Sequence, residues 1–142
     1  MRALVVDDSR AMRTILSRIL RKAGVEEIRE AADGSEAIAR LEDGELPDVV
    51  LVDWNMPVMN GLELVKAVRR RPEWRRITIM MVTTENEQSQ VVRALAAGAH
   101  EYLIKPFDEA SLIDKLEILG LQPLLLDQAQ VPADQFSGGT RP

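Results

Sequence analysis

Short runs of β-branched and aliphatic residues recur along the chain and predict buried strands. The clearest runs cover residues 3–6, 49–52, 77–82 and 102–104. Each is too short for a typical helix and almost wholly apolar, as expected of strands covered on both faces. A fifth run, residues 25–32, is interrupted by charged side chains, which a sheet edge tolerates better than its centre. We therefore predict five strands, with the second at an edge.

The segments between these runs have helical periodicity. In the first segment the apolar positions Met12, Ile15, Leu16, Ile19, Leu20 and Ala23 follow the spacing of one helix face. Ser9 is suited to cap the start of this helix, and Gly24 is suited to end it. Further helices are predicted at residues 34–42, 61–70, 87–97 and 108–119. Strict alternation of strand and helix with short connections indicates a doubly wound α/β domain with a parallel sheet.

The periodic pattern ends near Leu119. Beyond it, Gly120 and Pro123 interrupt the helix, and residues 128–142 are rich in Gln, Gly, Pro, Ala and Asp. We predict a folded domain over residues 1–120 and a mostly disordered tail over residues 121–142. The tail's apolar positions are expected to dock on the domain itself, with docking on a partner as the alternative; they are Leu121, Leu124, Leu125 and Leu126.

Composition narrows the possible chemistry. The 142 residues, 46% of them apolar and 29% charged, suit one globular domain and include no apolar span of membrane length. The first residues carry no recognisable secretory signal, so a cytoplasmic location is expected. The chain has no cysteine and one histidine, which excludes disulfides and multi-histidine or thiolate metal sites. A net charge of -5 opposes general binding to nucleic acids.

Polar residues follow the predicted strands where each strand ends. Asp7 and Asp8 follow the first strand, Asp53 the third, Thr83 the fourth and Lys105 the fifth. The carboxyl ends of parallel strands converge on one crevice, so we expect these side chains to share a pocket. Three carboxylates beside one lysine repel one another, and a divalent cation would relieve that repulsion. With oxygen ligands only, Mg²⁺ is the predicted ion.

Beside such an ion, an ionised Asp can attack phosphorus while a lysine and a hydroxyl stabilise the charge on the phosphoryl oxygens. Asp53 suits the nucleophile's role, because it ends a central strand. Each residue alone has a plainer interpretation. An Asp pair after a strand can cap a helix, Thr83 can begin one, and Lys105 can lie in a solvated turn. Their joint placement at strand ends is what predicts a shared site.

Three other features have plainer interpretations too. His100 stands alone at a strand start and is interpreted as structural, and Trp54 is expected on the rim of the site. A basic cluster around Trp74 resembles a nucleic-acid patch, but cations are also favoured at a helix C-terminus, and we interpret it as a solvated helix end. Its members are Lys66, Arg69, Arg70, Arg71, Arg75 and Arg76.

Together these residues resemble the receiver domain of two-component response regulators, and most closely the single-domain chemotaxis regulators. The resemblance extends from Leu4 to about Leu119. It is carried by four segments: Val5-Val6-Asp7-Asp8-Ser9, Asp53-Trp54-Asn55-Met56-Pro57 with Met59-Asn60-Gly61-Leu62-Glu63-Leu64, Met81-Val82-Thr83-Thr84-Glu85, and Tyr102-Leu103-Ile104-Lys105-Pro106-Phe107.

The resemblance implies a flavodoxin-like sheet of order 2-1-3-4-5 and a phosphoacceptor rather than an enzyme acting on other substrates. Asp53 would accept a phosphoryl group from a histidine kinase, and the domain would catalyse its own phosphorylation and dephosphorylation. Asp8, the Asp53 carboxylate and the Asn55 backbone carbonyl would bind Mg²⁺, with Asp7 acting through a water. Lys105 and Thr83 would contact the phosphoryl oxygens, and Lys105–Pro106 would be a cis bond.

The resemblance also implies a switch. Thr83 would draw in the loop that follows it, and Tyr102 would turn from exposed to buried, which reshapes a target-binding face on the last two strands and helices. Asn55 and Glu85 match the rapidly self-dephosphorylating chemotaxis type. The chain departs from the family pattern at Asn60, where Asp is usual, and at Thr84, where a smaller residue is common.

Three other functions remain as alternatives. A phosphatase that works through an aspartyl phosphate would use similar residues, but the D-x-D spacing of the haloacid-dehalogenase type is absent from both Asp7-Asp8-Ser9 and Asp53-Trp54-Asn55. A nucleotide- or flavin-binding module would need a glycine-rich phosphate loop, and none follows any predicted strand. A phosphate sink or a regulator of a pathway other than motility would keep the same chemistry.

Overall fold

Strands and helices alternate along the whole of the described chain, residues 1–121 of the computed structural model. The order is β1 (Arg2–Val6), α1 (Arg10–Lys22), β2 (Glu27–Ala31), α2 (Gly34–Glu42), β3 (Val49–Val52), α3 (Gly61–Arg69), a short 3₁₀ helix η1 (Pro72–Trp74), β4 (Thr78–Thr83), α4 (Gln88–Ala97), β5 (Glu101–Ile104) and α5 (Glu109–Ile118). The predicted tail, with its leucines at 124–126, lies outside the described residues apart from Leu121.

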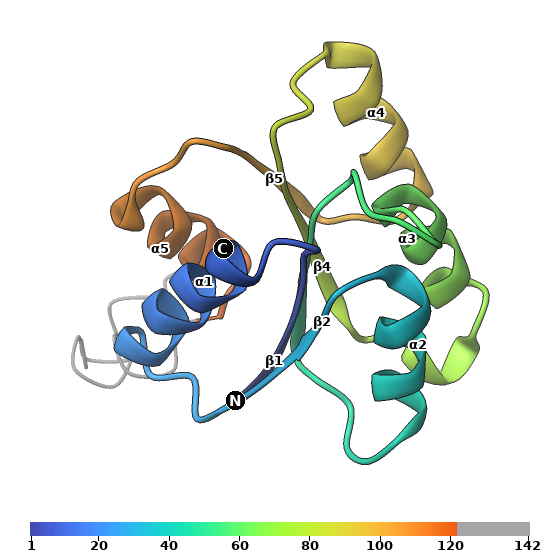
Figure 1. Cartoon of the computed structure of the whole chain (residues 1–142), viewed down its shortest axis with the longest axis horizontal. Coiled ribbons are helices and arrows are strands. Elements are labelled where there is room, and N and C mark those ends of the chain that lie inside the picture. Colours follow the sequence, from blue (N-terminus) through green and yellow to red (C-terminus); the bar gives the residue numbers. More distant parts are fainter. Residues whose placement is uncertain (122–142) are drawn as a thin grey trace, which may run out of the picture.

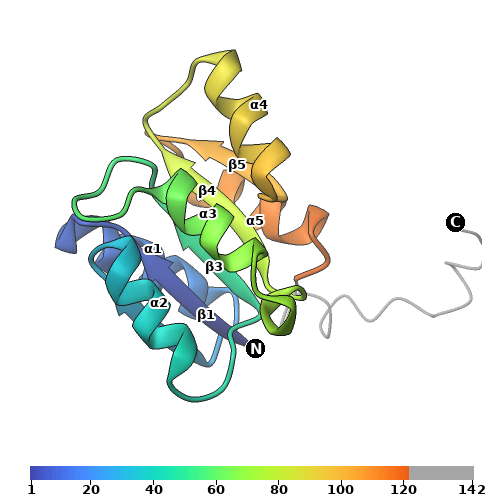
Figure 2. The same cartoon turned by 90° about the vertical axis from the view of Figure 1, so that its right-hand side faces the viewer.

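The five strands form one parallel sheet in the order β2-β1-β3-β4-β5. This confirms the doubly wound class, the flavodoxin-like order and the edge position of β2. Helices α1 and α5 cover one face of the sheet, and α2, α3 and α4 cover the other (Figures 1 and 2). Each face has its own apolar core, and neighbouring residues of β1 and β3 alternate between the two cores. None of the described helices is long and apolar enough to cross a membrane.

Side-chain caps fix where α1, α2, α3 and α5 begin, and thereby place their N-termini at the carboxyl ends of the strands. The predicted cap Ser9 accepts a hydrogen bond from the Met12 N–H, and Asp33, Asn60 and Asp108 cap α2, α3 and α5 in the same way. Gly24 follows α1 with a φ of 101°, a left-handed conformation that glycine adopts without strain. The caps and stops read from the sequence are therefore confirmed for α1.

The expected rim position of Trp54 is wrong. Its side chain is buried in the core beneath α3, in the same cluster as Leu62 and Val65. The guanidinium of Arg93 on α4 lies 5.8 Å from the centre of the ring and covers it from outside. That the indole turns inward is not revealed by its position next to Asp53 in the sequence.

Candidate functional site

The predicted site residues converge at the carboxyl edge of the sheet. Asp7 directly follows β1, and its N–H donates to the Ala31 carbonyl at 3.1 Å. Asp53 directly follows β3, and its N–H donates to the Val6 carbonyl at 3.0 Å. The backbone N–H groups of both acids thus continue the hydrogen-bond ladder of the sheet one residue beyond the strands. The sheet therefore fixes the backbone positions from which the two carboxylates extend.

Three carboxylates meet beside one lysine. Asp7, Asp8 and Asp53 each offer an oxygen within 4.8 Å of the others. Asp7 is only 1% exposed and Asp53 8%, whereas Asp8 is exposed. The Lys105 Nζ lies 2.8 Å from Asp7 Oδ2 and 3.4 Å from Asp53 Oδ2. With every group ionised, the cluster would carry a net formal charge of −3 + 1 = −2.

Burial makes the charge on Asp7 costly. Desolvation raises the pKa of the Asp7 carboxyl above its usual value, against the opposing effects of the Lys105 ammonium and the Ser9 N–H, while the neighbouring Asp53 charge raises it further. The Ser9 N–H donates to Asp7 Oδ1 at 2.8 Å. Both oxygens of Asp7 are therefore occupied, and the remaining electrostatic cost is one that a second cation would reduce.

A carboxylate oxygen of the cluster that accepts no hydrogen bond is also available to bind a metal ion. Asp53 Oδ1 is buried and accepts no hydrogen bond from the described residues. A buried carboxylate oxygen without a partner costs free energy unless a donor or a cation occupies it. The donors available are carboxylate oxygens, with the backbone carbonyls nearby, and such a set suits a hard ion such as Mg²⁺. The residues present thus fit the predicted ion.

Gly61, the first residue of α3, packs closely against the backbone of Asp53 and Trp54. Its N–H donates to the Trp54 carbonyl at 2.8 Å, and a Cβ at this position would lie 2.2 Å from the Asp53 carbonyl oxygen. Only glycine permits this close approach between the start of α3 and the end of β3. Asn60 accepts from the Glu63 N–H while Glu63 accepts from the Asn60 N–H, a complete capping box. The substitution of Asn for the usual Asp therefore preserves the turn.

A second group of contacts surrounds Glu85, on the loop after β4. Its N–H donates to the buried Thr83 Oγ1 at 3.3 Å, and its carbonyl accepts from the Tyr102 hydroxyl at 2.7 Å. Its carboxylate accepts from the Asn55 amide, and this bond together with one from Gln90 lowers the pKa of Glu85. Sequence reasoning assigned Glu85 only a role in tuning a rate and missed its contacts with Thr83, Tyr102 and Asn55.

Tyr102 is buried in this structure. Its hydroxyl is held by Glu85, and burial, with the nearby Glu85 and Asp53 charges, raises the pKa of Tyr102 to about 12. The Lys105–Pro106 peptide bond is cis, as the resemblance implied. The Lys105 N–H donates to the Thr83 carbonyl at 2.9 Å, which joins the end of β5 to the end of β4.

The other candidates lie elsewhere. His100 Nδ1 accepts from the Ile79 N–H at 3.1 Å, which agrees with its structural interpretation. Arg70, Arg75 and Arg76 are exposed, as expected of a solvated helix end. Arg69 differs, because its guanidinium donates to the carbonyls of Gly98, Trp74, Arg75 and Ile77 and is partly buried. That arginine joins the end of α3 to the segment before β4 and to the loop between α4 and β5.

The fold and the site together define a doubly wound α/β domain with an acidic pocket and a lysine at the carboxyl edge of its sheet. Residues 3–117 match the response regulator receiver domain, and the chain belongs to that family.

Named relatives are chemotaxis proteins. The chain is 44% identical over 119 residues to chemotaxis protein CheY1 of Helicobacter pylori, covering 84% of this chain and 96% of the relative. It is 46% identical over 121 residues to a chemotaxis protein CheY homolog of Campylobacter jejuni, covering 84% and 93%. Among solved structures, chemotaxis response regulator CheY4 of Vibrio cholerae matches with a TM-score of 0.77 and 40% identity over 83% of this chain and 97% of that one.

Proposed function

We propose that this receiver domain is a signalling switch that accepts a phosphoryl group on Asp53 from the phosphohistidine of a histidine kinase. The observation that supports this most directly is Asp53 Oδ1, a buried carboxylate oxygen that accepts no hydrogen bond from the described residues, set among two further acids and Lys105. An oxygen in this position is free to act as a nucleophile or to bind an ion. The paired oxygens of Asp7 are not.

The proposed transfer is a displacement at phosphorus. An Asp53 carboxylate oxygen forms a bond to phosphorus, the P–N bond to the donor histidine breaks, and the imidazole leaves with the electron pair and takes up a proton. The product is a mixed anhydride on Asp53. Attack by water on phosphorus later releases inorganic phosphate and restores the carboxylate. Mg²⁺, when bound, supplies positive charge that offsets both the acids and the phosphoryl oxygens.

The chain's own residues have separate roles in this proposal. Asp8, the Asp53 carboxylate and the Asn55 backbone carbonyl hold the ion, and Asp7 acts through a water. The Lys105 ammonium, already 3.4 Å from Asp53 Oδ2, stabilises the charge on the phosphoryl oxygens. Thr83 turns its hydroxyl toward the same oxygens.

Turning Thr83 toward a phosphoryl group would release its bond from the Glu85 N–H, and Glu85 in turn holds Tyr102. The proposed output is a shift in the population of conformers of this loop and of the face made by α4, β5 and α5. Exposed apolar side chains lie on that face; they are Val92, Leu95, Ile104 and Ile118. A downstream protein target is expected to bind there.

The chemical proposal is tested by incubating the chain with Mg²⁺ and acetyl phosphate and measuring the intact mass, with and without a chelator. One added phosphoryl group is expected, and it should be absent from Asp53→Asn and from the chelated sample. Labelling of a different residue, or labelling that survives Asp53→Asn, would overturn the assignment. The Asn55 and Glu85 pair predicts that the label decays quickly in Mg²⁺, and persistence for hours would contradict that rate.

The relatives' names favour chemotaxis as the pathway. The proposed partner is therefore a component of the flagellar switch, and phosphorylated protein should bind a peptide from that switch more tightly than Asp53→Asn does. Equal binding by the two would instead support a phosphate sink or a regulator of another pathway, with the same phosphoryl chemistry.

A further inference from the structure

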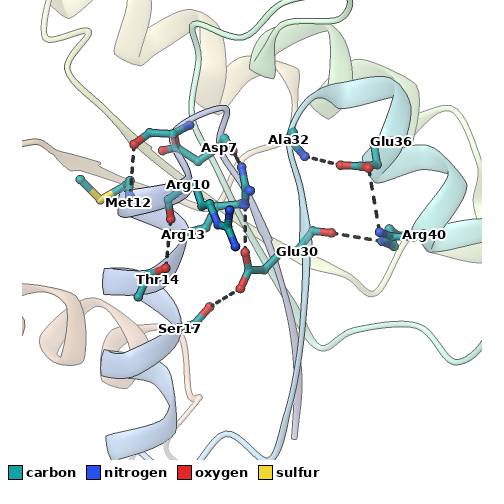
Figure 3. A network of polar contacts seen from close by, with 11 residues as sticks. Asp7, Arg10, Met12, Arg13, Thr14, Ser17, Glu30, Ala32, Glu36 and Arg40 are labelled. Carbon is teal, nitrogen blue, oxygen red and sulfur yellow. Dashed lines mark hydrogen bonds and ion pairs between the residues drawn. The ribbon is translucent and has the colours of Figure 1, made fainter.

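An arginine outside the pocket is joined to the backbone of the acid pair. Arg13 lies in the first turns of α1, and its side chain is only 16% exposed. Its Nη1 donates to the Asp7 carbonyl oxygen at 2.8 Å, and its Nε donates to Glu30 Oε1 at 2.9 Å (Figure 3). The guanidinium therefore bridges the end of β1 and the edge strand β2.

Glu30 keeps this arginine in one orientation. It lies on β2 opposite Val5 of β1 in the register of the sheet. Its second oxygen, Oε2, accepts from the Ser17 hydroxyl at 3.4 Å, and its backbone carbonyl accepts from Arg40 Nε at 3.1 Å (Figure 3). Contacts from α1 and α2 thus hold Glu30 from both sides, and Glu30 orients the fork of Arg13.

As a result, the backbone of Asp7 is fixed at both ends from the same strand. Its N–H donates to the Ala31 carbonyl directly, and its carbonyl reaches Glu30 through Arg13. The Asp7 carbonyl and the Asp8 N–H belong to one planar peptide unit. Fixing the carbonyl therefore fixes the plane from which the Asp8 side chain departs.

Asp8 depends on that plane more than its two neighbours do. Asp7 is held by Ser9 and Lys105, and Asp53 by Lys105. The exposed Asp8 carboxylate has no hydrogen bond to another described residue, yet its oxygen lies within 4.8 Å of the other two acids. On the proposed function, Asp8 is a direct ligand of Mg²⁺. We propose that Arg13, oriented by Glu30, is a positioning residue that holds Asp8 in place to bind the ion.

A second explanation of Arg13 predicts the opposite result. If this arginine acted only as a cation near three acids, its removal would strengthen Mg²⁺ binding, because a repulsive charge would be lost. If it acts through geometry, its removal weakens binding. Lysine retains the charge but offers one ammonium instead of a planar fork, so Arg13→Lys cannot reach the Asp7 carbonyl and Glu30 with the same geometry.

The test is calorimetric titration of Mg²⁺ into the unphosphorylated full chain, which measures binding without any turnover. Residues that orient metal ligands typically change affinity by 10–100-fold when replaced. We expect Arg13→Met to weaken Mg²⁺ binding by about tenfold or more, and Arg13→Lys to weaken it as well. The matched control is Arg18→Met on the same helix, which is exposed and makes no ion pair in the described part of the chain; it should bind Mg²⁺ as the wild type does.

Two variants of Glu30 test the orienting step. Glu30→Ala removes the acceptor of Arg13 Nε and should weaken Mg²⁺ binding. Glu30→Gln keeps an acceptor oxygen and should restore most of the affinity. Because Glu30 acts through Arg13, the double variant with Arg13→Met should bind no more weakly than Arg13→Met alone.

The results separate this inference from the proposed function. Wild-type affinity, or tighter binding, in folded Arg13→Met or Arg13→Lys would overturn the positioning role and leave phosphorylation of Asp53 untouched. Absence of Mg²⁺ binding by the wild type would overturn both. If Arg13→Met does not fold, as judged by circular dichroism, Arg13→Lys and the Glu30 pair decide the question with the same titration.

Discussion

Charged residues lie at both ends of the sheet, but pairing dominates their environment at one end and burial at the other. At the amino end, acids and bases are exposed and paired. The Met1 amine lies 2.9 Å from Glu26 Oε1, and Arg2 pairs with both Glu27 and Glu45. Pairing controls the electrostatics there, because the amine lowers the pKa of Glu26 and the Glu27 contact raises the pKa of Arg2. Folding therefore favours the charged forms of Glu26 and Arg2.

At the carboxyl end, burial controls the electrostatics. Desolvation is the main cause of the raised pKa of both Asp7 and Tyr102, and Asp53 Oδ1 has no partner in the described chain. Folding therefore disfavours the ionised forms of Asp7 and Tyr102, and a cation bound beside Asp7 would offset the cost there. The comparison shows that pairing marks the stabilising end of the sheet and incomplete pairing the functional end.

The largest expected effect comes from packing behind the site. Gly61→Ala would place a Cβ 2.2 Å from the Asp53 carbonyl oxygen, so the end of β3 must move. We expect the free energy of unfolding to fall by about 3 kcal/mol or more. Gly44→Ala, at the amino end, has a φ of 96° but no close contact, and should cost about 1 kcal/mol. Urea denaturation of both variants checks this, and similar losses would contradict the comparison.

Lys105→Met should destabilise the carboxyl end next most strongly. It leaves Asp7 and Asp53 without their cation, and we expect a loss of about 2 kcal/mol in a chelator. Added Mg²⁺ should recover much of this loss, since it supplies positive charge in the same place. The measurement is urea denaturation with EDTA and with Mg²⁺; a loss that Mg²⁺ leaves unchanged would show that the lysine's role is packing.

Asp53→Asn should have the opposite sign. It removes one of three crowded negative charges, so in EDTA the variant should be more stable than the wild type by about 1 kcal/mol. The increase in melting temperature that Mg²⁺ gives the wild type should be much smaller in this variant. A thermal melt of both proteins with and without the ion tests both statements, and destabilisation in EDTA would be the contrary result.

Tyr102 offers a direct measure of burial at this end, because it is the chain's only tyrosine. Its pKa is raised from 10.0 to about 12, so absorbance of the phenolate should appear near pH 12 rather than near pH 10. The folded state then disfavours the phenolate relative to the unfolded state. The stability linked to Tyr102 is therefore complete below pH 10 and is lost as the pH rises through 12. Titration near pH 10 in folded protein would contradict the burial.

The smallest effect is expected at the amino end. Arg2→Met removes exposed ion pairs to Glu27 and Glu45, and such pairs contribute little because water and salt screen them. The melting temperature should change by less than about 2 °C, and that small change should disappear at high salt. A larger loss, insensitive to salt, would mean that the pairing at this end does more than the comparison allows.

Most of the fold was predictable because its signals are local. The Ser9 cap, the apolar face from Met12 to Ala23 and Gly24 bound α1 with no help from the rest of the chain. The position of β2 followed from its charges alone. The convergence of Asp7, Asp53 and Lys105 also followed, since parallel strands bring their carboxyl ends together whatever the sequence separation.

The rest depended on side-chain directions that no local pattern encodes. Trp54 is buried in the cluster that contains Leu62 and Val65, and Arg69 donates to carbonyls of two loop segments instead of extending into solvent. Glu85 contacts Thr83 through its N–H and Tyr102 through its carbonyl, and backbone groups carry no sequence signal. In the sequence, Arg13 looks like any other polar residue of a helix. Only its hydrogen bond to the Asp7 carbonyl shows that it lies behind the site.

The charges of β2 have a further consequence for the molecule in concentrated solution. An edge strand exposes backbone donors and acceptors that can pair with a strand of another molecule. The edge strand β2 carries the charged residues Glu27, Arg29 and Glu30, and Arg40 from α2 donates to the Glu30 carbonyl. A second chain that approached this strand would have to displace those contacts and bury charge. Glu30, which orients Arg13, therefore belongs to a set of charged residues that also disfavours aggregation through intermolecular sheet extension.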